Sequence, residues 1–162
     1  MKCRNCNRGE LTKSKEKYLY TQSGLPNVVL IDVDVRRCPE CGAHEVVIPR
    51  IEELFRTIAF AVIHKPARLS GAEVRFLRKY LGLSGTAFAE HMGVDPSTVS
   101  NWENDKAPIG SPSDRLLRMM VVHQSPVEHY ELTELTKIAD AQAQPLEVRV
   151  HPKPTGWELA AA

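Results

Sequence analysis

Four cysteines stand in two closely spaced pairs, and their spacing is that of metal ligands. Cys3 pairs with Cys6 and Cys38 with Cys41, each pair as C-x-x-C. Such a pair holds one ion from a tight turn, and four thiolates complete the tetrahedral coordination that zinc prefers. No position is then left for water or substrate. We therefore expect a structural zinc site, with iron as the less favoured metal and no catalysis at the ion.

Disulfide and redox roles fit these cysteines less well. The first residues, MKCRNCNRGELTKSKEK, lack the apolar core of a secretory signal. We therefore expect a cytoplasmic protein, in a compartment where structural disulfides are rare. A thioredoxin-like motif would be one pair at a strand-to-helix junction, whereas here two pairs lie far apart. His44 is close enough to replace a ligand, but we expect it to be a surface side chain.

Two strands must bring the cysteine pairs together. YLYTQ at 18–22 and VVLIDVDV at 28–35, joined around SGLPN, predict a hairpin. Alternation along the second strand predicts one buried face, made of Val29, Ile31, Val33 and Val35. Gly42 directly follows the second pair, where a knuckle turn needs a positive φ. A ribbon this small buries little core, so metal binding and folding should be one event, and chelation should unfold it.

From Ile51 the spacing of the apolar residues becomes that of an amphipathic helix. Apolar residues at helical spacing run from there to Ile63, with Glu52 and Glu53 in the first turn. Acidic residues are favoured at that end of a helix. Pro66 closes the helix. HKPARLSG at 64–71 then predicts a linker, and we place a domain boundary there.

Three short helices separated by turn signals follow. Ser70 with Glu73 forms a capping box, Ser84 caps a second helix over 86–92, and Asp95 caps a third. Two helices of this size around a turn with glycine match a helix-turn-helix. The expected core between them consists of Phe88, Ala89, Met92, Val94, Val99 and Trp102.

The third of these helices leaves four short polar side chains free of that core. They are Ser97, Thr98, Ser100 and Asn101. On a helix inserted into a major groove, Asn pairs with adenine, and Ser or Thr meets a base or a phosphate. An ordinary solvated helix face is the alternative interpretation.

Charge is balanced overall but not evenly distributed. The chain has 21 Lys and Arg, 20 Asp and Glu, and a net charge of +1. The amino-terminal part is basic, the middle neutral and the tail acidic. Because affinity for DNA depends largely on phosphate neutralisation, a neutral reading domain needs dimerisation and nearby cations. The candidates are Arg75, Arg78, Lys79, Lys106 and Arg115. No apolar run is long enough for a membrane span, so no membrane role is expected.

The carboxyl-terminal part carries weaker signals. Residues 111–123 predict a helix that completes the bundle or pairs with a second copy, and 126–144 predict an acidic helix. PLEVRV at 145–150 predicts a strand, followed by a loose end. An exposed Trp157 in that end would be a good anchor for a partner.

The segment LSGTAFAEHMGVDPSTVSNWENDKAP resembles the helix-turn-helix of phage-repressor (XRE) type, including the WEN after the recognition helix. With CRNC and CPECG before it, the arrangement resembles the MqsA-like antitoxins with their YgiT-type zinc finger, over roughly residues 1–123. This resemblance implies a homodimer that binds a palindromic operator in double-stranded DNA and holds a toxin on its zinc domain. It also implies that Ser97 and Asn101 read bases. Two residues depart from the family: Gly85 replaces a phosphate-contacting glutamine of many relatives, and Asn101 stands where a well-known member has arginine.

We thus predict an α+β protein of two domains. The limits are 1–49 for a zinc-bound β-rich ribbon, 50–69 for a connecting helix and linker, 70–123 for an all-α helix-turn-helix domain, and 124–162 for a helix and tail. The expected function is a sequence-specific repressor that is the antitoxin of a type II toxin–antitoxin pair and regulates its own operon. A stand-alone regulator with a structural zinc ribbon is the alternative. An enzyme is not expected, because the metal has no open position and no nucleophile and base are paired.

Overall fold

Strand β2 (Val28–Arg37) is the centre of a five-stranded sheet. On one edge it pairs antiparallel with β1 (Thr12–Leu19). Its other edge is shared: β3 (His44–Val47) pairs antiparallel with its end, and β4 (Val148–Lys153) pairs parallel with its beginning. Strand β5 (Gly156–Leu159) adds antiparallel to β4. The sheet therefore combines the first and last segments of a chain that the computed structural model describes over residues 1–124, 130–138 and 143–161.

A β-bulge divides β2 into two halves with different buried faces. Lys17 of β1 lies opposite both Ile31 and Asp32, and Asp32 has a φ of 56°. The extra residue shifts the alternation by one position, so the predicted single face was wrong. The side chains that point into the core are Val28, Leu30, Val33 and Val35, while Val29 and Ile31 are only partly buried.

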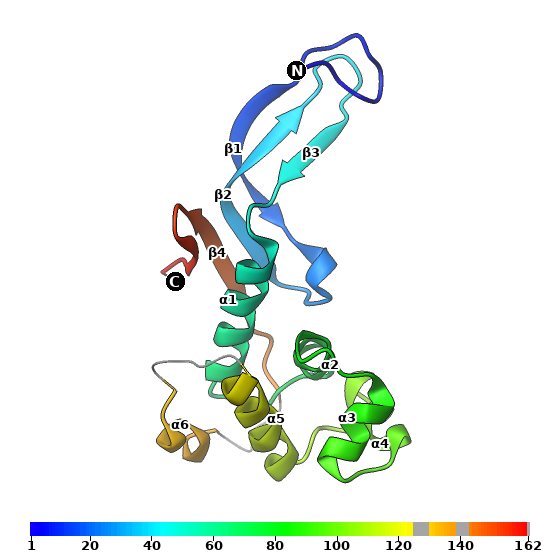
Figure 1. Cartoon of the computed structure of the whole chain (residues 1–162), viewed down its shortest axis with the longest axis vertical. Helices are drawn as coiled ribbons and strands as arrows, with labels where there is room; N and C mark the ends of the chain where they lie inside the picture. Colours follow the sequence, from blue (N-terminus) through cyan, green and yellow to red (C-terminus); the bar gives the residue numbers. More distant parts are fainter. Residues whose placement is uncertain (125–129, 139–142, 162) are drawn as a thin grey trace.

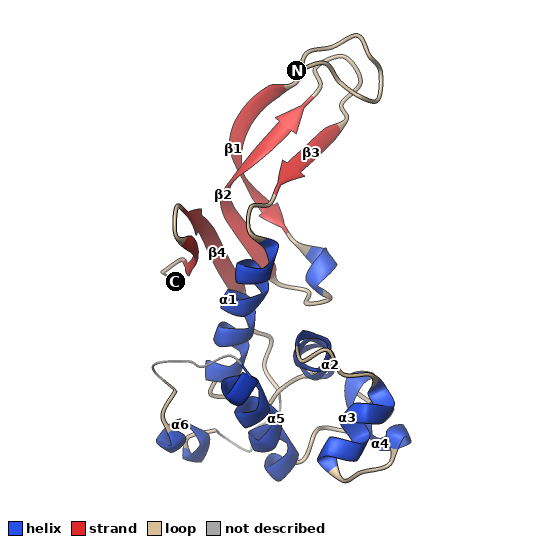
Figure 2. Ribbon diagram, in the orientation of Figure 1, coloured by secondary structure: helices blue, strands red, loops and turns tan. Residues whose placement is uncertain are grey.

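Helix α1 (Ile51–His64) connects the sheet to the helical half of the molecule (Figure 1). Its buried residues are Leu54, Ile58, Ala59, Val62 and Ile63. They belong to one continuous core with Leu30 of β2, Val150 of β4 and Leu117 of the helical part. The α+β class and the two-part architecture are thus confirmed: Figure 2 shows the strands at one end and most helices at the other.

The helical half begins with the caps expected from the sequence. Helix α2 (Gly71–Tyr80) opens with the Ser70–Glu73 capping box. Helix α3 (Gly85–Met92) is capped by Ser84 and α4 (Pro96–Glu103) by Asp95. Helix α5 (Ser111–Gln124) closes the bundle. These local signals were sufficient because a capping side chain satisfies backbone N–H groups wherever the helix later packs.

The segment predicted to be a linker is instead held by buried charges. Lys65 is 5% exposed and pairs with Glu73 at 2.7 Å. The guanidinium of Arg118, itself 1% exposed, donates to the carbonyls of residues 63, 65 and 67 and pairs with Asp114 at 2.6 Å. Asp114 also accepts from the backbone of Leu69 at 2.7 Å. Residues 64–71 therefore join the two halves firmly, and the domain limits given above stay a prediction.

The carboxyl-terminal end is a hairpin and not a loose end. Strand β4 overlaps the predicted strand at 145–150 only over 148–150 and runs on to Lys153, and β5 pairs back onto it. Trp157 of β5 is half-buried, and its indole Nε1 donates to Pro49 at 2.7 Å, so it is not a free anchor. The helix predicted over 126–144 is present only as α6 (Leu132–Thr136), because the described residues 130–131, 137–138 and 143–144 are not helical. Residues 126–129 and 139–142 lie outside the described residues. Among the described residues, no helix has the length and apolar character of a membrane span.

Candidate metal centre and nucleic-acid interface

The four cysteines lie on two loops of matching conformation at the far end of the sheet (Figure 1). In the first loop the backbone carbonyl of Cys3 accepts a hydrogen bond from the amide of Asn7. In the second loop the backbone carbonyl of Cys38 accepts one from the amide of Gly42. Asn7 has a φ of 56° and Gly42 a φ of 71°. Each residue directly follows the second cysteine of its pair. The positive φ expected at Gly42 is confirmed, whereas its counterpart Asn7 was not recognised, although asparagine is one of the few residues that tolerate this conformation.

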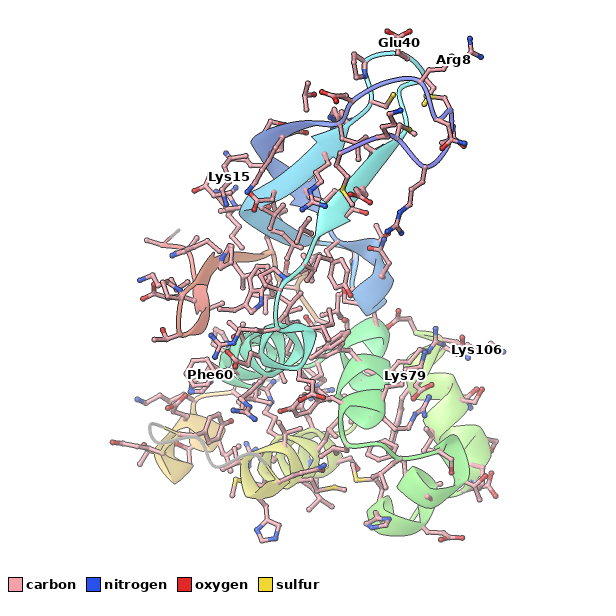
Figure 3. The ribbon with its side chains drawn as sticks, turned by 45° about the horizontal axis from the view of Figure 1, so that its top comes forward. Arg8, Lys15, Glu40, Phe60, Lys79 and Lys106 are labelled. Atoms are coloured by element: carbon pink, nitrogen blue, oxygen red, sulfur yellow. The ribbon has the colours of Figure 1, made fainter. Side chains whose placement is uncertain are left out.

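Gly9 permits the two loops to approach. A Cβ placed on it would lie 2.6 Å from the sulfur of Cys38, closer than atoms can pack. The side chains of Arg8 and Glu40 project from the tips of the two loops, beside the sulfur atoms (Figure 3). A small residue at position 9 is therefore a requirement of the site and not only of the turn.

The sulfur positions fit a tetrahedral metal ion. All four sulfurs lie within 4.8 Å of one another, with Cys3 to Cys41 at 3.7 Å and Cys6 to Cys38 at 3.6 Å. Zinc–sulfur bonds of about 2.3 Å in a tetrahedron place the sulfurs about 3.8 Å apart. A disulfide requires about 2.0 Å, so these cysteines are unbridged. His44 is exposed and is not part of the cluster.

Hydrogen bonds and burial shift the pKa values of Cys6, Cys38 and Cys41 in different directions. A backbone hydrogen bond from Ala43 and the side-chain amide of Asn5 lower the pKa of Cys41 to about 6. Backbone hydrogen bonds from Gly9 and Arg8 lower the pKa of Cys6. Burial raises the pKa of Cys38 to about 11. A bound cation would favour the thiolate form at every position and would cross-link the two loops.

Helices α3 and α4 pack at an angle around a tight turn. Gly93 ends α3 with a φ of 65°, and its amide closes the helix. The expected core is present: Phe88, Ala89, Val99 and Trp102 are buried, and Met92 and Val94 pack against them. This geometry leaves one face of α4 toward solvent.

The four predicted DNA-contacting residues lie on or beside that exposed face of α4. Ser97, Ser100 and Asn101 are exposed, and Thr98 is half-buried. Ser97 hydrogen-bonds the capping carboxylate of Asp95, and Ser100 accepts from Asn104 at 3.3 Å. Their positions are compatible with a helix that enters a major groove.

Glu103, at the end of α4, binds two of the expected phosphate-contacting cations. Arg78 pairs with both carboxylate oxygens of Glu103, at 2.5 and 3.1 Å, and also donates to Leu83 at 2.8 Å. Arg75 reaches the same carboxylate at 3.3 Å. Since the side chain of Arg78 is only 13% exposed, its expected role at phosphate was wrong: it fixes α4 against α2. Lys79 and Lys106 remain exposed, and Figure 3 shows them on the helical half.

The comparison with known families agrees with this geometry. Residues 74–119, from α2 into α5, match the family described as Helix-turn-helix. This part of the chain is an XRE-type helix-turn-helix domain. The chain is thus a DNA-binding transcription regulator, and the match covers the helical half only.

Proposed function

We propose that this regulator is a dimeric repressor that binds a palindromic operator in its own promoter. The observation that carries the proposal is the helix-turn-helix with short polar side chains on the open face of α4. In this role Ser97, Thr98, Ser100 and Asn101 contact bases or nearby phosphates. Its place of action is the cytoplasm, where the DNA is.

A dimer would supply the cations and contact area that one neutral domain lacks. Two copies double the number of phosphate contacts and match the symmetry of a palindrome. Helix α5 offers an apolar side chain for such pairing, because Leu116 is 44% exposed although its neighbour Leu117 is buried. We propose the outer face of α5 as part of the dimer contact.

We further propose that the cysteine loops hold zinc through Cys3, Cys6, Cys38 and Cys41 and that this end of the molecule binds a toxin. The four-thiol donor set supports zinc as a structural ion. The loops lie at the opposite end from α3 and α4, so a partner bound there would leave the DNA-reading face open (Figure 1). The alternative is a stand-alone regulator whose metal centre is a scaffold.

Two measurements test these proposals separately. Binding of the purified chain to its own upstream DNA and to a shuffled duplex of equal length tests the repressor role, and equal affinity would contradict it. Co-purification with the product of the neighbouring gene, followed by metal analysis and mass determination, tests the antitoxin role. A dimer that binds its operator without any protein partner would favour the stand-alone regulator.

A further inference from the structure

The four cysteines that would hold the metal differ in their exposure to solvent. Cys3 and Cys38 are each 2% exposed, Cys6 is intermediate and Cys41 is exposed. The loop that carries Cys41 is also open on both sides, because Pro39, Glu40 and Gly42 are exposed. A reagent from solution therefore meets Cys41 first.

The sulfur of Cys41 is in contact with a sulfur of the other loop. Cys3 lies 3.7 Å away, while Cys6 pairs in the same way with Cys38 at 3.6 Å. These two sulfur–sulfur contacts both join one loop to the other. Forming a bond between Cys3 and Cys41 requires a modest inward shift of the exposed loop.

Asn5 is the side chain that modifies Cys41 directly. Its amide Nδ2, on the first loop, donates to the sulfur of Cys41 at 3.6 Å. A hydrogen bond to a metal-bound thiolate withdraws electron density from sulfur, and such outer contacts tune the reactivity of the centre. Asn5 is exposed, so removal of its side-chain amide should leave the fold intact.

We propose that Cys41 is the oxidation-sensitive ligand of this centre and that a hydroperoxide converts Cys41 and Cys3 into an inter-loop disulfide with release of the metal. Asn5 acts as a positioning residue that slows this reaction. The inference needs only the metal centre and does not depend on a toxin partner.

The chemistry balances with hydrogen peroxide as oxidant. The Cys41 thiolate attacks one peroxide oxygen, the O–O bond breaks, and hydroxide leaves, giving a sulfenic acid. The Cys3 thiolate then attacks the sulfur of that sulfenic acid, forming the S–S bond and expelling a second hydroxide. Two thiolates lose two electrons, peroxide gains them, and the two hydroxides take up protons from solution. Having lost two of its four ligands, the metal ion dissociates.

The test uses the full chain loaded with zinc and treated with substoichiometric hydrogen peroxide. Metal release is followed with a chromogenic chelator, and disulfides are mapped by mass spectrometry of unreduced peptides. We expect zinc release in step with a Cys3–Cys41 disulfide. A first disulfide between Cys38 and Cys41, or oxidation that begins at Cys6, would overturn the proposal.

A second pair of variants tests the role of Asn5. Asn5→Ala should release zinc about 2- to 10-fold faster under peroxide, the effect of losing one hydrogen bond to sulfur. Glu10→Gln, an exposed change at the end of the same loop, should match the unmodified chain. Circular dichroism before oxidation confirms that both variants are folded. Equal rates for Asn5→Ala and Glu10→Gln would refute the positioning role.

Discussion

Asn101 is the side chain on α4 best suited to distinguish one base pair. It is exposed, and its amide carries both a donor and an acceptor, which adenine matches in the major groove. We expect Asn101→Ala to cost about 1–3 kcal/mol of discrimination at one operator position. Binding measured by fluorescence anisotropy on single-substitution operators checks this. Equal losses on operator and random DNA would make Asn101 a positioning residue instead.

Glu103 makes the stability of the helical half depend on pH. Its burial works to raise its pKa, but the hydrogen bonds and charges of Arg78 and Arg75 outweigh that effect and lower the pKa. A lowered folded-state pKa contributes stability above the unfolded value of about 4.3, and that stability is lost as pH falls through the folded value.

Glu103→Gln should therefore lower the free energy of unfolding by about 1–3 kcal/mol at neutral pH, because Arg78 loses its charged partner. The difference from the unmodified chain should shrink once the pH is below about 4. Urea titrations at several pH values measure it. Glu90→Gln, on the exposed side of α3, is the matched control, with an expected change within about 0.5 kcal/mol. A deficit that stays constant from neutral to acidic pH would contradict the charge argument.

At the scale of elements, α5 binds the segment that follows α1. Arg118 donates to the carbonyl of Ile63 in the last turn of α1 and to two carbonyls of that segment, at 2.5–2.9 Å, and is neutralised by Asp114. Arg118→Met should lower the free energy of unfolding by about 3–5 kcal/mol, because it leaves a buried carboxylate without its partner. Chemical denaturation of the variant is the measurement. A loss below about 1 kcal/mol would mean that the segment is not held by this contact.

The tail hairpin is a second such connection. Val150 of β4 is fully buried beside Leu30 of β2, whereas the side chain of Arg149 points outward and is 48% exposed. Val150→Ala should lower the free energy of unfolding by about 1.5–3 kcal/mol, the effect of two lost methyl groups and a cavity. Arg149→Ala should change it by no more than about 0.5 kcal/mol. Similar values for both would mean that β4 contributes little to the core in solution.

These elements also show which features a single sequence reveals. The caps at Ser70, Ser84 and Asp95 were predictable because each depends on a side chain and a backbone only a few residues away. The bulge at Asp32 was not, because nothing local requires an extra residue there, and the pairing partner decides it. The docking of β4 on β2 was hidden for the same reason. The cysteine cluster could be predicted because cysteines that bind one metal ion recur in the sequence at a characteristic spacing.

The whole molecule has one continuous core, which extends from the base of the sheet through α1 to α5. It includes Leu25, Val28 and Ile58 as well as Phe88 and Val121. The cysteine loops lie beyond this core, and no cysteine belongs to it. The metal should therefore stabilise the tip of the sheet, while apolar packing and the buried charges of α5 stabilise the rest.

Metal removal should consequently unfold the tip of the sheet, while the base of the sheet stays folded. After a strong chelator is added, the native amide signals of residues 1–11 and 38–43 should disappear from a two-dimensional NMR spectrum, since the metal would be the main link between the two loops. Signals of Val28, Phe88 and Val150 should persist, because their packing does not involve the metal. Cys38→Ser should give the same spectrum without chelator. Loss of the whole sheet with retained helices would place the boundary at 64–71 instead, and loss of all signals together would make the metal essential for the entire fold.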